Sequence, residues 1–179
     1  QPSEFIPLAE EKGLIERIGT WTLHQATKDI AAMEGTPYVA VNMSAAQFAS
    51  GKLPEIVRSA LDAANLPANR LEIEITESLL LSDDAGVLFQ MDALRDMGIK
   101  IAMDDFGTGF SSLGYLWRYG FDRLKIDRSF ISGLDENSER SMEIIESVVL
   151  LGKRLGMQVT AEGVETRNQS DILSDLGCD

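Results

Sequence analysis

Oxygen-bearing side chains recur where segments of alternating β-branched and apolar residues end. One amide and four carboxylates make up this set: Asn42, Glu74, Asp104, Asp105 and Glu162. Carboxylate, amide and water oxygens are the ligands that the hard cations Mg²⁺ and Mn²⁺ prefer. Two such ions about 3.5–4 Å apart can clamp the attacking and leaving oxygens of an in-line phosphoryl displacement. The set therefore predicts a two-ion site for phosphate chemistry.

Four residues give this site a more definite chemistry. The tandem pair Asp104 and Asp105 can place one carboxylate on each of two ions, or bridge them. Lys125 is the lone cation expected near these strand ends, where it could stabilise charge on a reacting phosphate. Glu162 could ligate an ion or accept a proton from water. Each residue alone is more often a cap, a turn or a surface residue, so the interpretation depends on their joint position.

A glycine-rich segment follows the paired aspartates and consists of Phe106, Gly107, Thr108 and Gly109. Such a segment can form a mobile loop that covers a ligand, or it can supply backbone N–H groups to phosphate. A tight connection to the next helix would use the same residues equally well. The residues alone leave both interpretations open.

The charge balance limits the partners of such a site. The chain has 29 Asp and Glu residues against 16 Lys and Arg residues, which gives a net charge of −13 at pH 7. This composition argues against a general electrostatic grip on polymeric nucleic acid, so a phosphate ligand would need metal cations. The single cysteine, Cys178, excludes an internal disulfide, and no run approaches the roughly 18 apolar residues of a membrane span. We therefore expect a cytoplasmic chain with no membrane contact by this segment.

Five strand-like segments alternate with helical ones. Strands are predicted at residues 39–42, 71–76, 99–104, 123–127 and 157–161. Helical spacing is predicted over residues 7–33 with a break at Gly13, in a long stretch that reaches Met97, and from about residue 166 to residue 176. Ser44 is the predicted N-cap of a helix after the first strand. Repeats of about 30 residues with a helix between strands are typical of βαβ units and a parallel sheet.

Side chains alternate between two sides of a strand, and here the alternation gives each strand an apolar side and a polar side. In the second strand, Leu71, Ile73 and Ile75 oppose Glu72, Glu74 and Thr76. Strands of an open sheet covered by helices on both faces would show near-continuous apolar runs instead. A barrel fits better, because its apolar side meets the outer helices. An antiparallel sheet with one wet face is the alternative, and the helical segments between the strands disfavour it.

The predicted site lies where barrel enzymes place theirs, at the carboxyl ends of the strands. Asn42, Asp104, Asp105 and Glu162 fall at strand ends, and Glu74 and Lys125 lie one or two residues inside. Five strands are too few to close an eight-stranded barrel, so we expect strands to be missing at one or both ends. The length is that of one domain, which we assign to residues 1–179.

Six collinear segments resemble the EAL-type cyclic di-GMP phosphodiesterases. They are FIPLAE at 5–10, NMS at 42–44, EITES at 74–78, DDFGTG at 104–109, KID at 125–127 and AEGVE at 161–165. The resemblance implies an α/β fold, a modified (β/α)8 barrel of the TIM type that is incomplete at both ends in this chain. It also implies hydrolysis of cyclic di-GMP to linear pGpG, in bacterial second-messenger signalling, with two Mg²⁺ or Mn²⁺ ions.

The resemblance further implies a role for each matching residue. The implied metal ligands are Asn42, Glu74, Asp104, Asp105 and Glu162, and Asp105 is the one expected to serve both ions. Lys125 resembles the lysine that holds the nucleophilic water, and Glu162 resembles the glutamate proposed as ligand or general base. Glu77 resembles the glutamate that anchors the loop after the aspartates, whereas Asp127 and Glu165 resemble supporting residues. That loop and the adjacent helix resemble the dimer surface of the family, which implies a homodimer.

The sequence departs from the family pattern in three places. The Glu-Ala-Leu signature and the Gln-Gly segment near the end of the domain are absent, and Phe110 replaces a commoner tyrosine. A catalytically inactive cyclic di-GMP receptor or a protein-interaction module is therefore the alternative to a phosphodiesterase. The full set of Glu74, Asp104, Asp105, Lys125 and Glu162 favours the enzyme, because a receptor has no chemical need for it. A metal-dependent barrel enzyme that acts on carbon acids is a remote third possibility.

Overall fold

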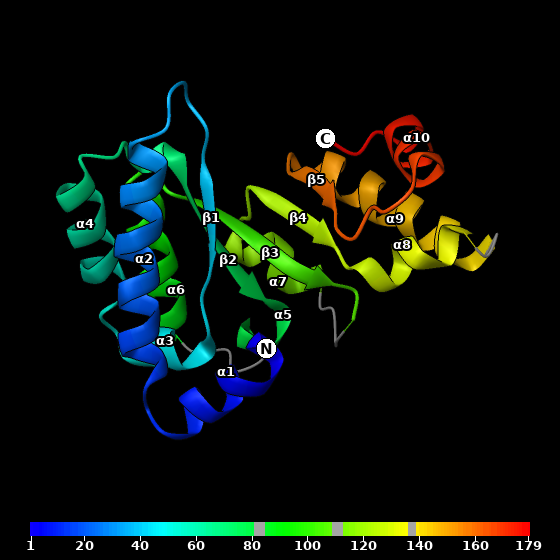
Figure 1. Ribbon diagram of the computed structural model, residues 1–179. Helices are drawn as coiled ribbons and strands as arrows, with labels where there is room; N and C mark the ends of the chain where they lie inside the picture. The colour runs from blue at the N-terminus through cyan, green and yellow to red at the C-terminus, as the bar shows by residue number, and fades with distance from the viewer. Residues whose placement is uncertain (81–84, 109–112, 136–138) are drawn as a thin grey trace. The chain divides into compact units, whose positions relative to one another are not determined.

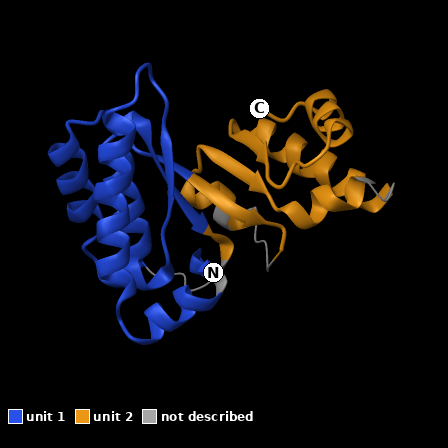
Figure 2. Ribbon diagram, viewed as in Figure 1, with its two compact units in different colours: residues 1–75, 79–101 blue, residues 76–78, 102–179 orange. Residues whose placement is uncertain are grey.

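A computed structural model describes residues 1–80, 85–108, 113–135 and 139–179, and Figure 1 shows its helices and strands. The chain divides into two compact units, which Figure 2 shows in different colours. Unit 1 comprises residues 1–75 and 79–101, and unit 2 comprises residues 76–78 and 102–179. In both units parallel strands alternate with helices, which confirms the predicted α/β class.

Unit 1 is built from two strands and the helices that pack on them. Its elements are α1 (Pro2–Glu11), α2 (Ile15–Ala31), β1 (Val39–Asn42), α3 (Ala45–Ala49), α4 (Leu53–Ala64), the 3₁₀ turn η1 (Ala68–Arg70), β2 (Leu71–Thr76, except its last residue) and α6 (Ala85–Asp96). Strands β1 and β2 are parallel, and Asn42 lies opposite Glu74. Helix α2 contacts β1, α3 and α4, and α6 contacts α3 and α4.

The core of unit 1 buries both the apolar and the polar residues of β2. Its apolar row is fully buried, together with Leu23 of α2 and Met91 of α6. The polar row of β2 is buried as well, since Glu72 and Glu74 are only 2% and 7% exposed. Two buried carboxylates side by side on one strand face are costly unless they are paired or bind cations. The polar side of β2 is therefore a buried surface whose carboxylates need hydrogen-bond partners or a cation.

Most predicted boundaries of unit 1 are confirmed. Strands β1 and β2 have the predicted bounds, and Ser44 is the N-cap of α3 in a capping box with Gln47. Gly13 lies between α1 and α2 with a φ of 65°, a conformation that glycine adopts readily. The long helical stretch predicted after β2 contains α5 (Glu77–Leu80) and α6. Residues 81–84 between them lie outside the described part of the chain.

Unit 2 contains three parallel strands and four helices within its described residues. Its elements are β3 (Lys100–Phe106, from Ala102 onward), α7 (Leu113–Tyr119), β4 (Arg123–Ile126), α8 (Arg128–Asp135), α9 (Glu139–Leu155), β5 (Gln158–Ala161) and α10 (Arg167–Leu176). β4 pairs with both β3 and β5, and α9 covers β4 and β5. Strand β3 ends two residues later than predicted, and this extension adds Asp105 and Phe106 to the strand that already contained Asp104.

The sequence predicts no membrane span, and the described helices can be compared with that prediction. None of them, within residues 1–80, 85–108, 113–135 and 139–179, combines the length and the apolar character that crossing a bilayer requires.

Candidate functional site

A register shift in β3 directs two consecutive aspartates to one site. Strict alternation would send Asp104 and Asp105 to opposite sides of the strand. Met103 lies opposite Leu124, but Phe106 lies opposite Ile126, so β3 carries one extra residue between these pairs. Such an extra residue is a β-bulge, a feature that re-aims side chains next to active sites. Asp105 sits in the bulge with a φ of 54°, a left-handed conformation that Asp tolerates better than most residues.

The bulge produces a compact carboxylate cluster in unit 2. One carboxylate oxygen from each of Asp104, Asp105 and Glu162 lies within 4.8 Å of the others. Asp104 and Asp105 come from β3, and Glu162 directly follows β5. The backbone N–H of Glu162 donates to the carbonyl of Ile126 at 3.0 Å, which continues the β4–β5 pairing past the end of β5. Three oxygens at these separations could hold a divalent cation.

Lys125 of β4 joins two of these carboxylates. Its Nζ lies 3.0 Å from Asp104 Oδ1 and 2.6 Å from Glu162 Oε1. The side chains of Lys125 and Asp104 are 9% and 10% exposed, whereas that of Glu162 is 38% exposed. The lysine is therefore held deep in the site, and the glutamate reaches the solvent side. This arrangement suits a lysine that orients a water molecule beside a glutamate that can take its proton.

The charges around Asp105 favour a bound cation. Burial is the largest cause that raises the pKa of the Asp105 carboxyl above its ordinary value. The carboxylates of Asp104, Asp127 and Glu162 raise this pKa further, and Lys125 lowers it only in part. One ammonium group thus faces three clustered carboxylates. A divalent cation would supply the missing positive charge, and the all-oxygen donor set fits Mg²⁺ or Mn²⁺.

Asn42 and Glu74 form a second polar pair, in unit 1. Asn42 Nδ2 donates to Glu74 Oε2 at 2.9 Å, and the backbone N–H of Met43 donates to the Glu74 carbonyl at 2.9 Å. Because the amide nitrogen faces the carboxylate, Asn42 Oδ1 is left outside this hydrogen bond. The carbonyl oxygen is the atom that a hard cation prefers. The pair is therefore arranged to offer oxygen ligands.

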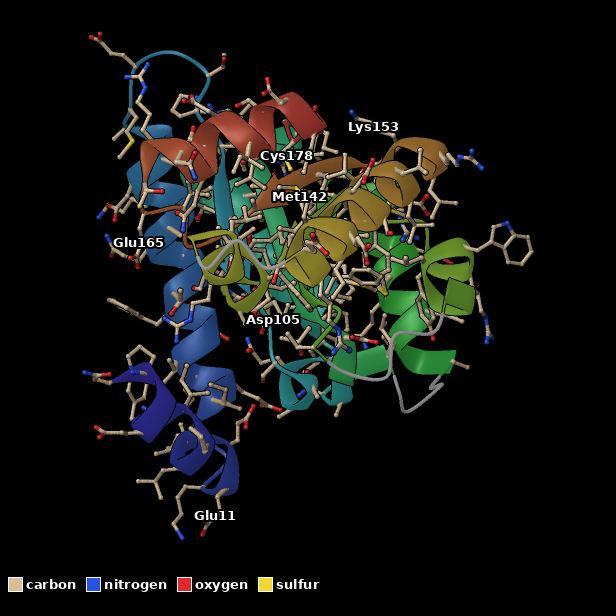
Figure 3. The ribbon with its side chains drawn as sticks, turned by 90° about the vertical axis from the view of Figure 1, so that its right-hand side faces the viewer. Glu11, Asp105, Met142, Lys153, Glu165 and Cys178 are labelled. Atoms are coloured by element: carbon tan, nitrogen blue, oxygen red, sulfur yellow. The ribbon has the colours of Figure 1, made fainter. Side chains whose placement is uncertain are left out.

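The three predicted supporting residues differ in burial and in hydrogen bonding. Glu77 begins α5 and is buried. Burial by itself would raise the pKa of the Asp127 carboxyl, but hydrogen bonds from Ser129 and from the Arg128 backbone lower it overall. Glu165 is exposed and lies apart from Asp105 in Figure 3. Its backbone N–H, not its carboxylate, makes the described contact, a 2.7 Å hydrogen bond to Gln169 Oε1.

The segment after the aspartates holds the bulge in place. Phe106 is buried, whereas Gly107 and Thr108 are exposed. The Thr108 hydroxyl and backbone N–H both donate to the Asp105 carbonyl, at 2.9 and 3.3 Å. These bonds stabilise the left-handed conformation of Asp105. Gly109, the last residue of the predicted substrate-side segment, and Phe110 lie outside the described residues.

Gly163 is a further site residue that the sequence showed only as part of a motif. It follows Glu162 with a φ of 68°, and a Cβ atom there would lie 2.5 Å from the Cβ of Arg128. The end of β5 can therefore approach the start of α8 only when residue 163 has no side chain. No local sequence signal predicts this, because the contact joins two segments distant in the chain.

We expect Gly163→Ala to destabilise the protein more than Gly156→Ala does. Both glycines have positive φ values, 68° and 76°, so both alanine variants lose about 1–2 kcal/mol from backbone strain. Only residue 163 also meets a neighbour, since nothing lies within 4 Å of a Cβ at Gly156. Thermal unfolding of the two variants measures the difference. Equal losses would contradict the close approach of Gly163 and Arg128.

Comparison with known proteins bears on this site. The model of the EAL domain family matches residues 1–179. Over 99% of the chain, identity is 42% to the bifunctional diguanylate cyclase/cyclic di-GMP phosphodiesterase MucR and 38% to the cyclic di-GMP phosphodiesterase NbdA, both of Pseudomonas aeruginosa. The chain spans 26% and 23% of the lengths of these two proteins.

A solved structure matches the fold closely. The structure of the PaMucR phosphodiesterase in complex with c-di-GMP matches the whole chain with a TM-score of 0.94 and 41% identity, and the match covers 74% of that chain. The predicted fold class, an α/β barrel of the TIM-like EAL type, is thereby confirmed.

Proposed function

The chain belongs to the EAL domain family, and we propose that residues 1–179 act as one domain that hydrolyses cyclic di-GMP to linear pGpG. The cluster of Asp104, Asp105 and Glu162, with Lys125 joining two of its members, carries this proposal. A receptor that only binds the dinucleotide needs neither a general base nor a buried lysine beside it. The names of MucR and NbdA and the c-di-GMP complex of PaMucR support the choice of substrate.

Each residue of the site has a proposed role in the hydrolysis. Two Mg²⁺ or Mn²⁺ ions, when bound, would neutralise the phosphodiester and activate water. The proposed ligands are Asn42, Glu74, Asp104, Asp105 and Glu162. Lys125 donates a hydrogen bond that orients the attacking water, and Glu162 accepts the proton that this water loses. Glu77 anchors the segment that follows the aspartates, and Asp127 and Glu165 support the ligands.

We also propose that the chain works as a homodimer in the cytoplasm. The surface would consist of the loop after Asp105 and the adjacent helix α7. The family resemblance supports this surface, and Trp117 of α7 adds a large apolar side chain that is 81% exposed. Analytical ultracentrifugation of the full-length protein measures the stoichiometry, and a monomer at every concentration would exclude the dimer.

A product assay tests the function. The full-length protein is stripped of metal with a chelator and incubated with cyclic di-GMP and either Mg²⁺ or Mn²⁺, and pGpG is separated by chromatography. We expect product only with added metal. We expect Glu162→Gln to lower the rate by about 100-fold or more, because removing a positioned proton acceptor typically has an effect of this size.

The matched control for this assay is Glu11→Gln. Glu11 also pairs with a lysine, Lys12, at 2.7 Å, but both side chains are exposed. This variant is expected to keep full activity. A folded protein that binds cyclic di-GMP but releases no pGpG with either ion would identify a receptor instead. Absence of both binding and product would favour a protein-interaction module.

A further inference from the structure

A buried glutamine fixes the chain directly after Asn42. Gln47 of α3 is 7% exposed, and both ends of its amide are in use. Its Oε1 accepts from the backbone N–H of Ser44 at 3.0 Å, and its Nε2 donates to Met43 Sδ at 3.1 Å. The two residues that follow Asn42 are thus held by one side chain. A displaced Gln47 would remove one hydrogen bond from each of them.

Gln47 sits where α2 has no side chain. A Cβ atom at Gly19 would lie 1.9 Å from Gln47 Nε2 and 2.7 Å from its Cδ, so no other residue at position 19 leaves room for the amide. Glycine in the middle of a helix is unfavourable relative to alanine. Gly19 is buried near the start of the 17-residue helix α2, which contacts α3. The space for Gln47 is a physical reason for a glycine there.

The rest of α3 is anchored from a second helix. Gln90 of α6 donates from Nε2 to the carbonyl of Phe48 at 2.7 Å. Met43 is tied to β2 by its backbone N–H, and Asn42 is tied to Glu74 by its amide. The position of the Asn42 side chain therefore depends on how Met43 and Ser44 are held. Among these contacts, the hydrogen bonds that Gln47 makes with Met43 and Ser44 depend on Gly19, because a side chain at position 19 would displace the Gln47 amide.

We propose that Gly19 is a positioning residue for Asn42 and Glu74, and that it acts by seating Gln47. The inference rests on the proposed function, in which Asn42 and Glu74 hold a divalent ion. Gly19 lies on a helix outside the polar pair and has no ligand atom to offer. Its effect on the ion is transmitted through Gln47 to Met43 and Ser44, and from them to Asn42.

The test is Mn²⁺ affinity, measured by calorimetry on the metal-free full-length protein well below its melting temperature. We expect Gly19→Ala to weaken Mn²⁺ binding about tenfold, the lower end of what lost support of a ligand usually does. Asn42→Ala should weaken it at least as much. The double variant should bind no more weakly than Asn42→Ala alone, because both changes remove the same ligand.

Two further variants separate positioning from simple loss of packing. Gly152→Ala makes a comparable clash, with Cβ 2.3 Å from Val159 Cγ2, but in the packing of α9 on β5. Any effect of Gly152→Ala on affinity should add to that of Asn42→Ala. In a Gln47→Ala background, which removes the side chain that Gly19 accommodates, Gly19→Ala should have no further effect on affinity.

The outcomes distinguish this inference from the proposed function. If Asn42→Ala weakens Mn²⁺ binding and Gly19→Ala does not, the positioning role is wrong and the proposed site stands. Additive effects of Gly19→Ala and Asn42→Ala would also overturn the positioning role. If Asn42→Ala leaves the affinity unchanged, the ligand role of Asn42 fails, and this inference fails with it.

Discussion

Asp105→Asn is expected to abolish nearly all hydrolysis while it raises the melting temperature of the metal-free protein. The rate should fall by about 10³-fold, since a ligand expected to serve both ions contributes several kcal/mol to stabilising the charge in the transition state. The amide is nearly isosteric with the carboxylate, and Asn also tolerates the left-handed φ of 54°. The variant therefore removes a charge without removing the bulge.

The gain in stability follows from the pKa of Asp105. Burial and three neighbouring carboxylates hold this pKa above its ordinary value, so the folded protein binds the proton more tightly than the unfolded chain. Stability is therefore lost as the pH rises from the ordinary pKa through the raised one, and the loss is complete above it. Asn at position 105 does not titrate, so the variant escapes this loss.

Thermal melts with and without Mn²⁺ check this prediction. With a chelator present, the advantage of Asp105→Asn should shrink as the pH falls into the range where Asp105 is protonated in the parent protein. Added Mn²⁺ should stabilise the parent more than the variant. Asp62→Asn, an exposed change on α4, is the matched control and should shift neither melt. A lower metal-free melting temperature for Asp105→Asn would refute the account of mutual repulsion.

How far the sequence predicts this molecule depends on whether a feature is local. The bounds of β1 and β2 could be predicted, because alternating side chains and the turn residues beside them are local signals. The residue types of the candidate site could be predicted for the same reason, by position at strand ends. The register shift that turns Asp104 and Asp105 to one side could not, since it depends on pairing between β3 and β4.

Close approaches between distant segments are the other hidden feature. In the sequence Gly19 is only a glycine within a predicted helix, and Gly163 is only part of a motif. The structure explains both glycines by close neighbours, Gln47 at Gly19 and Arg128 at Gly163. The supporting role of the Glu165 carboxylate stays a prediction, because the hydrogen bond described for Glu165 is local and runs from its backbone N–H to Gln169 Oε1.

Lys125→Met is expected to destabilise the metal-free protein by about 3 kcal/mol, the lower end for a broken buried pair, and to lower hydrolysis by about 10³-fold. Methionine keeps the length and the apolar stem of lysine but leaves the nearly buried Asp104 carboxylate without the ammonium 3.0 Å away. The lower end applies because Glu162, the other partner, is partly exposed. The rate falls because the water loses the donor that orients it.

The response to metal makes this prediction specific. Mn²⁺ supplies positive charge to the same carboxylates, so it should raise the melting temperature of Lys125→Met more than that of the parent protein. Lys12→Met breaks an exposed pair, which is worth at most about 1 kcal/mol, and should change little. If Lys125→Met is destabilised but hydrolyses at the parent rate, the lysine only balances charge. If Lys125→Met is as stable as the parent protein without metal, the carboxylates do not depend on the lysine. The argument that this site requires added cations then fails, because that argument assumes that the carboxylates repel one another.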